Sequence, residues 1–397
     1  MKETILSLCD GMEARFISMR RAFHRIPEPS FAEHQTQTKI CSYLKGAKIG
    51  FKRGVGGTGV VADVKGSRGR TIALRSDMDA LNIAEDTGLS FASRNRGFMH
   101  ACGHDAHMAM VLGAGLVLKR LGSDLPGRVR LIFQPGEETP PGGALSMIRD
   151  GALRSPKVGA IIGAHVVASV PSGKIAFNEG AISAAADDFK VTIVGRGGHG
   201  SNPHECVDAI VVAAQFITAL QTVVSRRVSG LDNVVVSIGK ISGGERDNII
   251  AGTVEMVGTI RTKTADLRRR VPAMIKKLLH GTCSGFGAEG RFEFMAGYPP
   301  IVCDEKFSGL VRRACIDILG KSRVTETKEL RMGGEDFAYY ARQVPGTFMF
   351  VGVGNKKKDS SESLHSSRFD IDEPVLKLGV AALAYSAYRY LSREKDV

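Results

Sequence analysis

The chain has 397 residues and a formal net charge of +13, with 43% hydrophobic and 24% charged residues. This composition is ordinary for a globular protein and excludes a disordered chain, while the length predicts two or three domains. The basic residues are spread along the chain with no zinc finger, aromatic RNA-binding signature or basic heptad region, so we expect a positive surface and no nucleic-acid partner.

The amino-terminal stretch and the cysteines indicate the cellular compartment in which we expect the protein. Residues 1–16, "MKETILSLCDGMEARF", mix acidic and apolar positions without a small-residue cleavage site, which predicts an amphipathic helix and no signal peptide. The seven cysteines are dispersed without a CxxC pair, which is typical of a reducing compartment. No apolar run approaches the roughly 20 residues that cross a bilayer. We therefore expect a cytoplasmic protein without a membrane partner.

The first part of the chain alternates helical and strand-like patterns. Apolar periodicity predicts two helices, at about 5–26 and 33–45, which the prolines of "IPEPSF" separate. A third helix is expected at 104–121 from its small and apolar residues. Runs of β-branched and apolar residues predict strands at 59–66, 70–80, 127–138 (ending in a turn) and 158–166. This rhythm predicts an α/β sheet that carries its chemistry at the strand ends.

Residues 187–297 follow a different pattern, typical of an inserted domain. The expected elements are strand 189–195, helix 206–227, strands 233–241 and 253–261, helix 265–283 and strand 291–295. This βαββαβ order is the split-βαβ, ferredoxin-like arrangement. Helix and strand alternation then resumes, with elements expected at 307–320, 347–354 and 374–391. The predicted organisation is one discontinuous domain, 1–186 with 298–397, interrupted by a second domain, 187–297.

The stretch "HACGHDAHMAM" (100–110) opens the third predicted helix with a concentration of metal-binding residue types. Cys102 and His104 lie two positions apart, so in an extended segment a thiolate and an imidazole can face one ion. Two ligands do not complete a site. A cysteine nucleophile with a histidine base is the alternative at this point.

Further candidates follow other predicted strands. Glu137 and Glu138 end "VRLIFQPGEE", and adjacent residues of a tight turn point in different directions, so one carboxylate can bind a metal while the other handles a proton. A solvated acidic turn is the alternative. Asp79 in "RSDMDAL" and His165 in "GAHV" also follow apolar strands, and His365 lies in "ESLHSSRFD".

The inserted domain offers a second group of polar candidates. His199 stands among the glycines of "GRGGHGSNPHE", which permit close approach of a ligand. Arg246 and Asn248 in "GGERDN" lie on a loop between the two middle strands, where they could hold a substrate carboxylate or oxyanion. Loop asparagines are also common turn formers.

Taken together, these motifs resemble the M20 family of metallopeptidases and amidohydrolases. The resemblance is carried by "FHRIPEPSF", "RSDMDAL", "HACGHDAHMAM", "FQPGEE", "GAHV", "GRGGHGSNPH", "RDNIIAGTVEMVGTIRT", "GGEDFAYY" and "LHSSRFDIDEP", which span nearly the whole chain. The most similar branch is that of the N-acyl-amino-acid amidohydrolases, which includes hippurate hydrolase, aminoacylase-like enzymes and indole-acetyl-amino-acid hydrolases.

The resemblance implies a zinc-peptidase-like catalytic domain, with a central mixed sheet flanked by helices, and an inserted lid or dimerisation domain. It implies two divalent ions, most typically zinc, with manganese, cobalt or nickel as alternatives. The implied ligands are Cys102, bridging both ions, with His104, Glu138, His165 and His365. Asp79 would orient a histidine ligand.

The resemblance also implies the reaction and the roles of the remaining residues. Glu137 would act as general base and acid in cleaving the amide of an N-acyl-L-amino acid. His199 would stabilise the oxyanion and, in a homodimer, reach the partner's site, while Asn248 would bind substrate from the lid. A dipeptidase or aminopeptidase is the main alternative. A cysteine hydrolase and a non-catalytic metal-dependent binding protein are the others.

Overall fold

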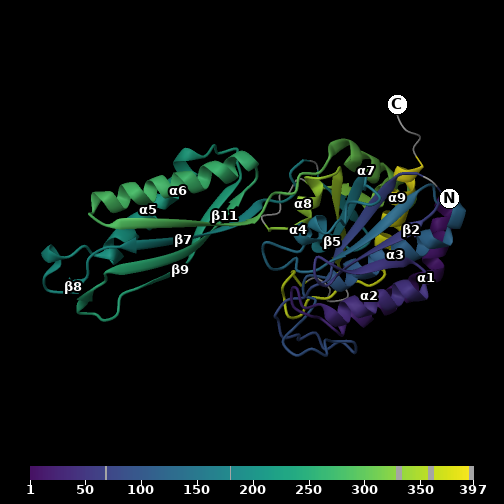
Figure 1. Cartoon of the computed structure of the whole chain (residues 1–397), viewed down its shortest axis with the longest axis horizontal. Coiled ribbons are helices and arrows are strands. Elements are labelled where there is room, and N and C mark those ends of the chain that lie inside the picture. Colours follow the sequence, from purple (N-terminus) through teal and green to yellow (C-terminus); the bar gives the residue numbers. More distant parts are fainter. Residues whose placement is uncertain (68, 179, 328–332, 356–361, 393–397) are drawn as a thin grey trace. The chain divides into compact units, whose positions relative to one another are not determined.

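The computed structural model describes residues 1–67, 69–178, 180–327, 333–355 and 362–392. The chain divides into two compact units (Figure 1). Unit 1 comprises Met1–Gly180, Val302–Glu329 and Asp336–Val397, and unit 2 comprises Ala181–Ile301 and Leu330–Glu335. The predicted insertion 187–297 falls within unit 2.

Unit 1 is built on an eight-stranded mixed sheet with the strand order β1-β2-β4-β3-β5-β14-β6-β13. Its strands are β1 (Gly50–Val55), β2 (Gly59–Lys65), β3 (Thr71–Asp77), β4 (Arg128–Gln134), β5 (Ala160–Pro171), β6 (Ile175–Phe177), β13 (Val324–Glu326) and β14 (Gly346–Gly354). The four central strands, β4, β3, β5 and β14, run parallel, whereas β1 and β2 pair antiparallel. The predicted α/β class with a mixed sheet is confirmed.

Helices cover both faces of this sheet. They are α1 (Lys2–His24), α2 (His34–Gly46), α3 (His104–Arg120), α4 (Ala144–Arg149), α7 (Glu305–Leu319), α8 (Phe337–Ala341) and α9 (Val375–Leu391). Helices α1, α3, α7 and α9 pack against one another and share one hydrophobic core with alternate residues of the central strands. Phe337 of α8 packs on the opposite face, against Phe348 of β14. The short elements β1, β6, β13, α4 and α8 were not predicted from the sequence.

Helix α3 is central to the site because it runs through the middle of unit 1. Its residues from His104 to Leu118 are all buried, so this stretch of the helix has no solvent-exposed face. A side chain at Gly115 would meet Leu131 of β4, and one at Gly113 would meet Val380 of α9 and Phe16 of α1. These two glycines therefore let the helix lie close to the sheet on one side and to α1 on the other.

Unit 2 is a four-stranded antiparallel sheet with two helices. Its strand order is β12-β7-β11-β9, from β7 (Ala185–Val194), β9 (Val234–Gly243), β11 (Thr253–Thr262) and β12 (Glu289–Tyr298). Helices α5 (Ala209–Arg227) and α6 (Ala265–Gly285) contribute to one apolar core with the sheet. The minor strands β8 (Gly198–His199) and β10 (Ile249–Ile250) pair with each other. The function of unit 2 as a lid stays a prediction.

Helix α5 differs from expectation in two respects. It begins at Ala209, after a short 3-10 turn at Pro203–Glu205, and not at residue 206. It is also long and apolar enough, by length and composition alone, to cross a membrane, which corrects the expectation that no apolar run approaches that length. A core helix of a globular protein passes the same test, and one side of α5 packs on the sheet of unit 2.

Candidate functional site

The register of the central strands brings the predicted site residues of unit 1 to one edge of the sheet. Asp77 at the end of β3 pairs with Gln134 at the end of β4, and Arg75 pairs with Gly163 of β5. Two residues further along, Asp77 and His165 therefore reach the same level. The parallel strands thus direct their carboxyl ends, and the turns that follow them, to one place.

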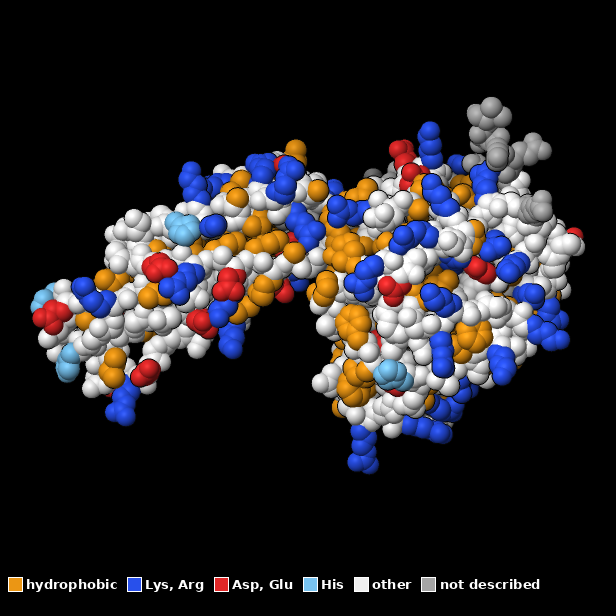
Figure 2. Space-filling view, viewed as in Figure 1, with side chains coloured by type: hydrophobic (Ala, Val, Ile, Leu, Met, Phe, Trp, Pro, Cys, Tyr) orange, Lys and Arg blue, Asp and Glu red, His pale blue; other side chains and the backbone are white. Residues whose placement is uncertain are grey.

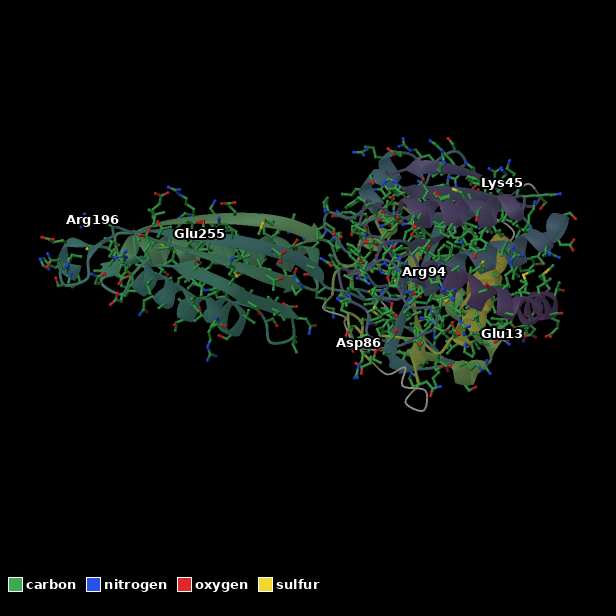
Figure 3. The ribbon with its side chains drawn as sticks, turned by 90° about the horizontal axis from the view of Figure 1, so that it is seen from below. Glu13, Lys45, Asp86, Arg94, Arg196 and Glu255 are labelled. Atoms are coloured by element: carbon green, nitrogen blue, oxygen red, sulfur yellow. The ribbon has the colours of Figure 1, made fainter. Side chains whose placement is uncertain are left out.

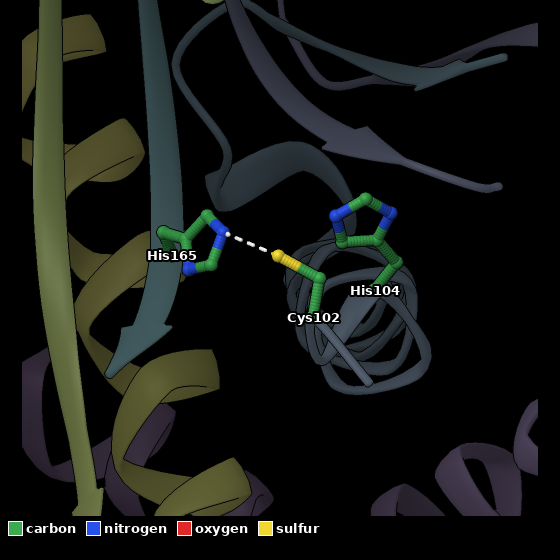
Figure 4. A group of neighbouring side chains, drawn as sticks. All are labelled: Cys102, His104 and His165. Atoms are coloured by element: carbon green, nitrogen blue, oxygen red, sulfur yellow. Dashed lines mark hydrogen bonds between the residues drawn. The ribbon is translucent and has the colours of Figure 1, made fainter. Parts of the chain in front are cut away.

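Cys102 and His104 approach this edge from the start of α3. Gly103 between them has φ 81°, a left-handed conformation that favours glycine. A Cβ at this position would also lie 2.2 Å from Val166 of β5. Sγ of Cys102 lies 3.4 Å from Nε2 of His165, and Figure 4 shows the thiol between the two imidazoles.

The hydrogen bonds of His104 and His165 determine which ring nitrogen carries the proton. Nδ1 of His165 lies 2.7 Å from the carbonyl oxygen of Val166, and Nδ1 of His104 lies 2.9 Å from that of Asp79. Because a carbonyl oxygen only accepts, each Nδ1 is the donor. In the neutral imidazoles, both Nε2 atoms therefore present lone pairs, which is the form that binds a metal.

Glu138 brings a carboxylate to the same point. Its Oε1 lies 3.8 Å from Nε2 of His104 and 3.7 Å from Nε2 of His365. Among the described residues, Nε2 of His104 and Oε1 of Glu138 are buried without a hydrogen-bond partner. Such orphaned atoms are costly unless something satisfies them. A divalent cation would satisfy both, and the thiol, imidazole and carboxylate donors suit zinc.

The electrostatic environment also favours a cation. Burial, together with the neighbouring carboxylates of Glu138, Glu137 and Asp77, raises the pKa of the Cys102 thiol. Burial alone would lower the pKa of His104, but the carboxylates of Asp77, Asp79 and Glu138 outweigh it and raise that pKa to about 10. An activated cysteine nucleophile requires a lowered pKa. The surroundings of Cys102 therefore disfavour a thiolate unless a cation is bound.

Asp79 and Glu33 hold the turn that carries the paired glutamates. Oδ2 of Asp79 accepts hydrogen bonds from the Glu138 N–H at 2.9 Å and from the Ser30 hydroxyl at 2.7 Å. The Gly136 N–H donates to Oε1 of Glu33 at 2.8 Å. Glu137, 6% exposed, has Oε2 4.0 Å from Nε2 of His104. The backbone of the turn is therefore fixed by hydrogen bonds to the Glu33 and Asp79 carboxylates, and both glutamate carboxylates lie near His104.

His365 is held in an unusual backbone conformation. Its φ is 68°, rare for a residue with a Cβ, and its N–H donates to the carbonyl of Ala101 at 2.9 Å. The segment after His365 also contacts the long loop between β3 and α3, because the N–H of Asp86 donates to the carbonyl of Ser367. Asp86 is labelled in Figure 3. Strain of this kind is common where a side chain must be presented for function.

The remaining predicted residues lie in unit 2. His199 of β8 pairs with Ile249 of β10, and the Gly200 N–H donates to the carbonyl of Asn248 at 2.8 Å. The Ser201 N–H donates to Nδ1 of His199 at 3.2 Å, which makes Nε2 the proton-bearing atom in the neutral ring. His199, Arg246 and Asn248 are exposed. His199 can therefore offer an N–H donor to a ligand.

Residues 73–389 match the model of the family described as peptidase family M20/M25/M40. The chain belongs to the M20 family. The resemblance stated from the sequence motifs is thereby confirmed.

M20 relatives of high similarity include both deacetylases and a peptidase. An N-acetyl-L-cysteine deacetylase of Bacillus subtilis is 38% identical over 97% of this chain and 90% of its own length. An N-acetyldiaminopimelate deacetylase of Halalkalibacterium halodurans is 37% identical over 94% and 98%. Thermostable carboxypeptidase 1 of Saccharolobus solfataricus is 38% identical over 96% and 97%. Among solved structures, the YXEP protein of Bacillus subtilis, described as a dinuclear metal binding peptidase, is 34% identical with a TM-score of 0.84, over 96% and 99%.

In this M20 chain, sequence reasoning overlooked the residues that support the site. Asp77, Arg75 and Asp336 form a buried network, with Arg75 donating to Asp77 at 2.9 Å and to Asp336 at 2.7 Å. Ser30 and Glu33, which hold the glutamate turn, were also not selected. An arginine inside the apolar strand "TIALRSD" was the available signal, because a buried guanidinium requires carboxylate partners.

Proposed function

We propose that this protein hydrolyses the amide bond of N-acyl-L-amino acids to a carboxylate and a free amino acid. Hydrolysis of amide bonds agrees with its family and with the deacetylases among its relatives. The observation that carries the proposal is the pair of buried, unpartnered atoms, Nε2 of His104 and Oε1 of Glu138, which face each other across 3.8 Å. Two more donors, Sγ of Cys102 and Nε2 of His165, lie 3.4 Å apart, and Cys102, His104 and His165 each offer a ligand atom within 4.8 Å of the other two.

The metal ligands in this proposal are Cys102, His104, Glu138, His165 and His365. Two divalent ions held there would supply Lewis acidity, which acidifies water and polarises the scissile carbonyl. Zinc is our first choice because of the thiolate and imidazole donors, with manganese, cobalt or nickel as alternatives. The dinuclear description of the YXEP structure supports two ions.

Glu137 is the proton-transfer group in this proposal. Its backbone is fixed by the Gly136 and Glu138 hydrogen bonds described above, and its carboxylate lies next to His104. It takes a proton from the attacking water and delivers it to the leaving amine. His199 stabilises the oxyanion through its Nε2 proton, since Ser201 occupies Nδ1.

Arg246 and Asn248 bind the substrate carboxylate in this proposal. They lie on the same exposed tip of unit 2 as His199, where the Gly200 N–H joins the two loops. A guanidinium and an amide are suited to an anionic carboxylate. Their position beside a proposed oxyanion donor supports a role for this tip in holding substrate.

We further propose that the protein is a homodimer formed through unit 2. The outward side of α5 is uncharged over about four turns, up to the exposed Arg226 and Arg227 of its last turn. It consists of Ile210, Val211, Ala214, Gln215, Thr218, Gln221, Thr222 and Ser225. An extended uncharged helix face of this kind is suited to contact with a second copy. On the face shown in Figure 2, Lys and Arg side chains are scattered over both units and interspersed with acidic ones.

A cytoplasmic location is part of the same proposal. All seven cysteines are free thiols. A reducing compartment keeps thiols in that state, which is compatible with Cys102 as a metal ligand.

The decisive experiment pairs metal analysis with turnover. Protein purified without added metal is analysed for bound elements, stripped with a chelator and reconstituted ion by ion, with N-acetyl and N-benzoyl amino acids and unblocked dipeptides as substrates. We expect two ions per chain and faster cleavage of the N-acyl substrates. Preferential cleavage of unblocked dipeptides would replace the proposal with the peptidase alternative, and full activity after complete stripping would exclude metal-dependent hydrolysis.

Glu137→Gln tests the proton-transfer step within the same experiment. Because the substitution keeps the shape of the side chain, we expect both ions to be retained while kcat falls by about 10²- to 10⁴-fold. Glu138→Gln is the matched variant, and it should lose metal. A Glu137→Gln protein with near-native turnover would overturn the role of Glu137.

A further inference from the structure

His107 lies next to two of the proposed ligands, His104 and His165, but the sequence resemblance does not assign it as a ligand. It is buried at 1% exposure, and its ring centroid lies 4.5 Å from that of His165 and 5.4 Å from that of His104. Asp77, His104 and His107 could by proximity alone form another metal site, because each offers a ligand atom within 4.8 Å of the others. The hydrogen bonds decide between a metal site and a supporting role.

Both ring nitrogens of His107 are already engaged. The Val166 N–H donates to Nε2 at 2.9 Å, and since a backbone N–H only donates, Nε2 holds the lone pair. Nδ1 then carries the proton and donates to Oδ1 of Asp77 at 2.7 Å. The other oxygen of Asp77 accepts from Arg75 at 2.9 Å. His107 therefore has no nitrogen lone pair left for an ion.

His104 also cannot bind an ion in the cluster of Asp77, His104 and His107 through Nδ1, its nitrogen nearer to Asp77. Its Nδ1 donates to the carbonyl of Asp79 at 2.9 Å, which leaves Nε2 as its only lone pair. That Nε2 lies 3.8 Å from the Glu138 carboxylate, in the cluster already assigned to metal. The proximity of Asp77, His104 and His107 is thus explained by hydrogen bonding without an ion.

Val166 is the residue through which His107 reaches a ligand. Its N–H is held by His107, and its carbonyl accepts from Nδ1 of His165 at 2.7 Å. That bond fixes the His165 ring with Nε2 directed at Sγ of Cys102, 3.4 Å away. One residue of β5 therefore connects the ring of His107 to the orientation of His165.

At Val166, where His107 binds the backbone, β5 is no longer paired with the neighbouring strand β3. The pairing of β3 with β5 ends at Arg75 and Gly163, three residues before Val166. An N–H beyond the end of a neighbouring strand requires another acceptor when it is buried. Nε2 of His107 supplies that acceptor, directly after the proposed ligand His165.

We propose that His107 is a positioning residue for His165, acting through the backbone N–H and carbonyl of Val166, and that Asp77 and Arg75 hold His107 in turn. This inference rests on the proposed metal site but not on the choice of substrate. The support is rigid because Arg75 is itself tied to Gln134 at 2.9 Å and to Asp336 at 2.7 Å. His107 therefore sets metal affinity without contacting metal or substrate.

Two substitutions of His107 separate its two hydrogen bonds. In His107→Gln, the side-chain oxygen can still accept from the Val166 N–H, as Nε2 does. In His107→Asn, the shorter amide can still donate to Asp77, as Nδ1 does, but leaves the Val166 N–H unpaired. We expect His107→Asn to weaken binding of the ion at His165 by about 10- to 100-fold, the usual loss when such support is removed, and His107→Gln to retain most of the affinity.

The measurements do not depend on turnover. Zinc dissociation constants are obtained by competition with a chromophoric chelator, and the thiolate-to-cobalt absorption of cobalt-loaded protein reports on the ion beside Cys102 and His165. Thermal unfolding of the metal-free variants shows that each one folds. The expected result is a weaker and altered cobalt band in His107→Asn that is largely restored in His107→Gln.

Three results would overturn this assignment. Wild-type affinity in both variants would show that His107 is dispensable, and equal losses in both would show that the link through Val166 is not the one that matters. A third ion in the wild type that disappears in His107→Asn would make His107 a ligand. If the wild type binds two ions tightly but cleaves no N-acyl amino acid, the proposed function fails while the role of His107 can still be measured.

Discussion

Asp79 and Glu138 are joined by a hydrogen bond from the Glu138 N–H to Oδ2 of Asp79, with a length of 2.9 Å. Oδ1 of the same carboxylate lies 3.3 Å from Nδ1 of His104. One buried residue therefore fixes the backbone of one proposed ligand through its side chain, and the ring of another through its main-chain carbonyl, which lies 2.9 Å from Nδ1 of His104. Such residues determine metal affinity although they do not touch the metal.

Asp79→Ala is accordingly expected to lower zinc affinity by about 10- to 100-fold, because the Glu138 N–H and the Ser30 hydroxyl lose their acceptor. Asp79→Asn should lose less, since its amide oxygen can still accept from Glu138. Competition with a chelator measures both. Asp86→Ala, an exposed position of the same loop, is the control. Unchanged affinity in Asp79→Ala would contradict the role of Asp79.

His199→Gln should lower kcat by about 10²- to 10³-fold at unchanged metal content, because one preorganised donor to the oxyanion is lost. His204→Gln, another exposed histidine of the same loop, should behave as wild type. Steady-state kinetics with an N-acetyl amino acid, together with metal analysis, checks this. A rise in KM at constant kcat would instead assign His199 to substrate binding.

His24 makes stability depend on pH. It lies between Asp105, 2.7 Å from Nδ1, and Glu85, 3.1 Å from Nε2. Burial alone would lower the pKa of His24, but Asp105 and Glu85 outweigh it and raise that pKa to about 9. A histidine whose pKa is higher in the folded state stabilises fully below its unfolded value, about 6.5, and this contribution disappears as pH rises through 9.

Metal-free protein should therefore lose at most about 3 kcal/mol of unfolding free energy between pH 6 and pH 9.5 through this one group. His24→Gln should be less stable at pH 6 and should lack this part of the pH dependence. Denaturant titrations at the two pH values measure it, with exposed His34→Gln as control. Parallel pH profiles for wild type and His24→Gln would place the effect elsewhere.

Thr218→Glu tests the proposed dimer by placing a charge on the uncharged side of α5. We expect a dimer for the wild type and dissociation to monomers for the variant, because a desolvated charge in such a contact has no partner. Light scattering after size-exclusion chromatography measures the mass. Lys276→Glu, exposed on α6, should remain dimeric. A dimeric Thr218→Glu protein would show that α5 is not the interface.

The sequence by itself determined which residue types gather at the site. Cys102, His104, Glu138 and His165 each follow an apolar strand or open an apolar helix, and such patterns are local. Because parallel strands end at one edge of a sheet, their assembly in one place could be expected from these patterns. The α/β class followed from the same periodicity.

Only the tertiary structure decided the roles of the residues around the ligands. His107 could not be distinguished from a ligand by its place in "HACGHDAHMAM". Its acceptor Asp77 and its donor Val166 lie 30 and 59 positions away in the chain. The outward side of α5 was likewise hidden, since composition does not tell which residues of an apolar helix the sheet covers. Local patterns indicate which residue types can bind a metal or transfer a proton. The proton positions of the histidines and the exposed faces of the helices depend on contacts between distant segments, which a single sequence does not specify.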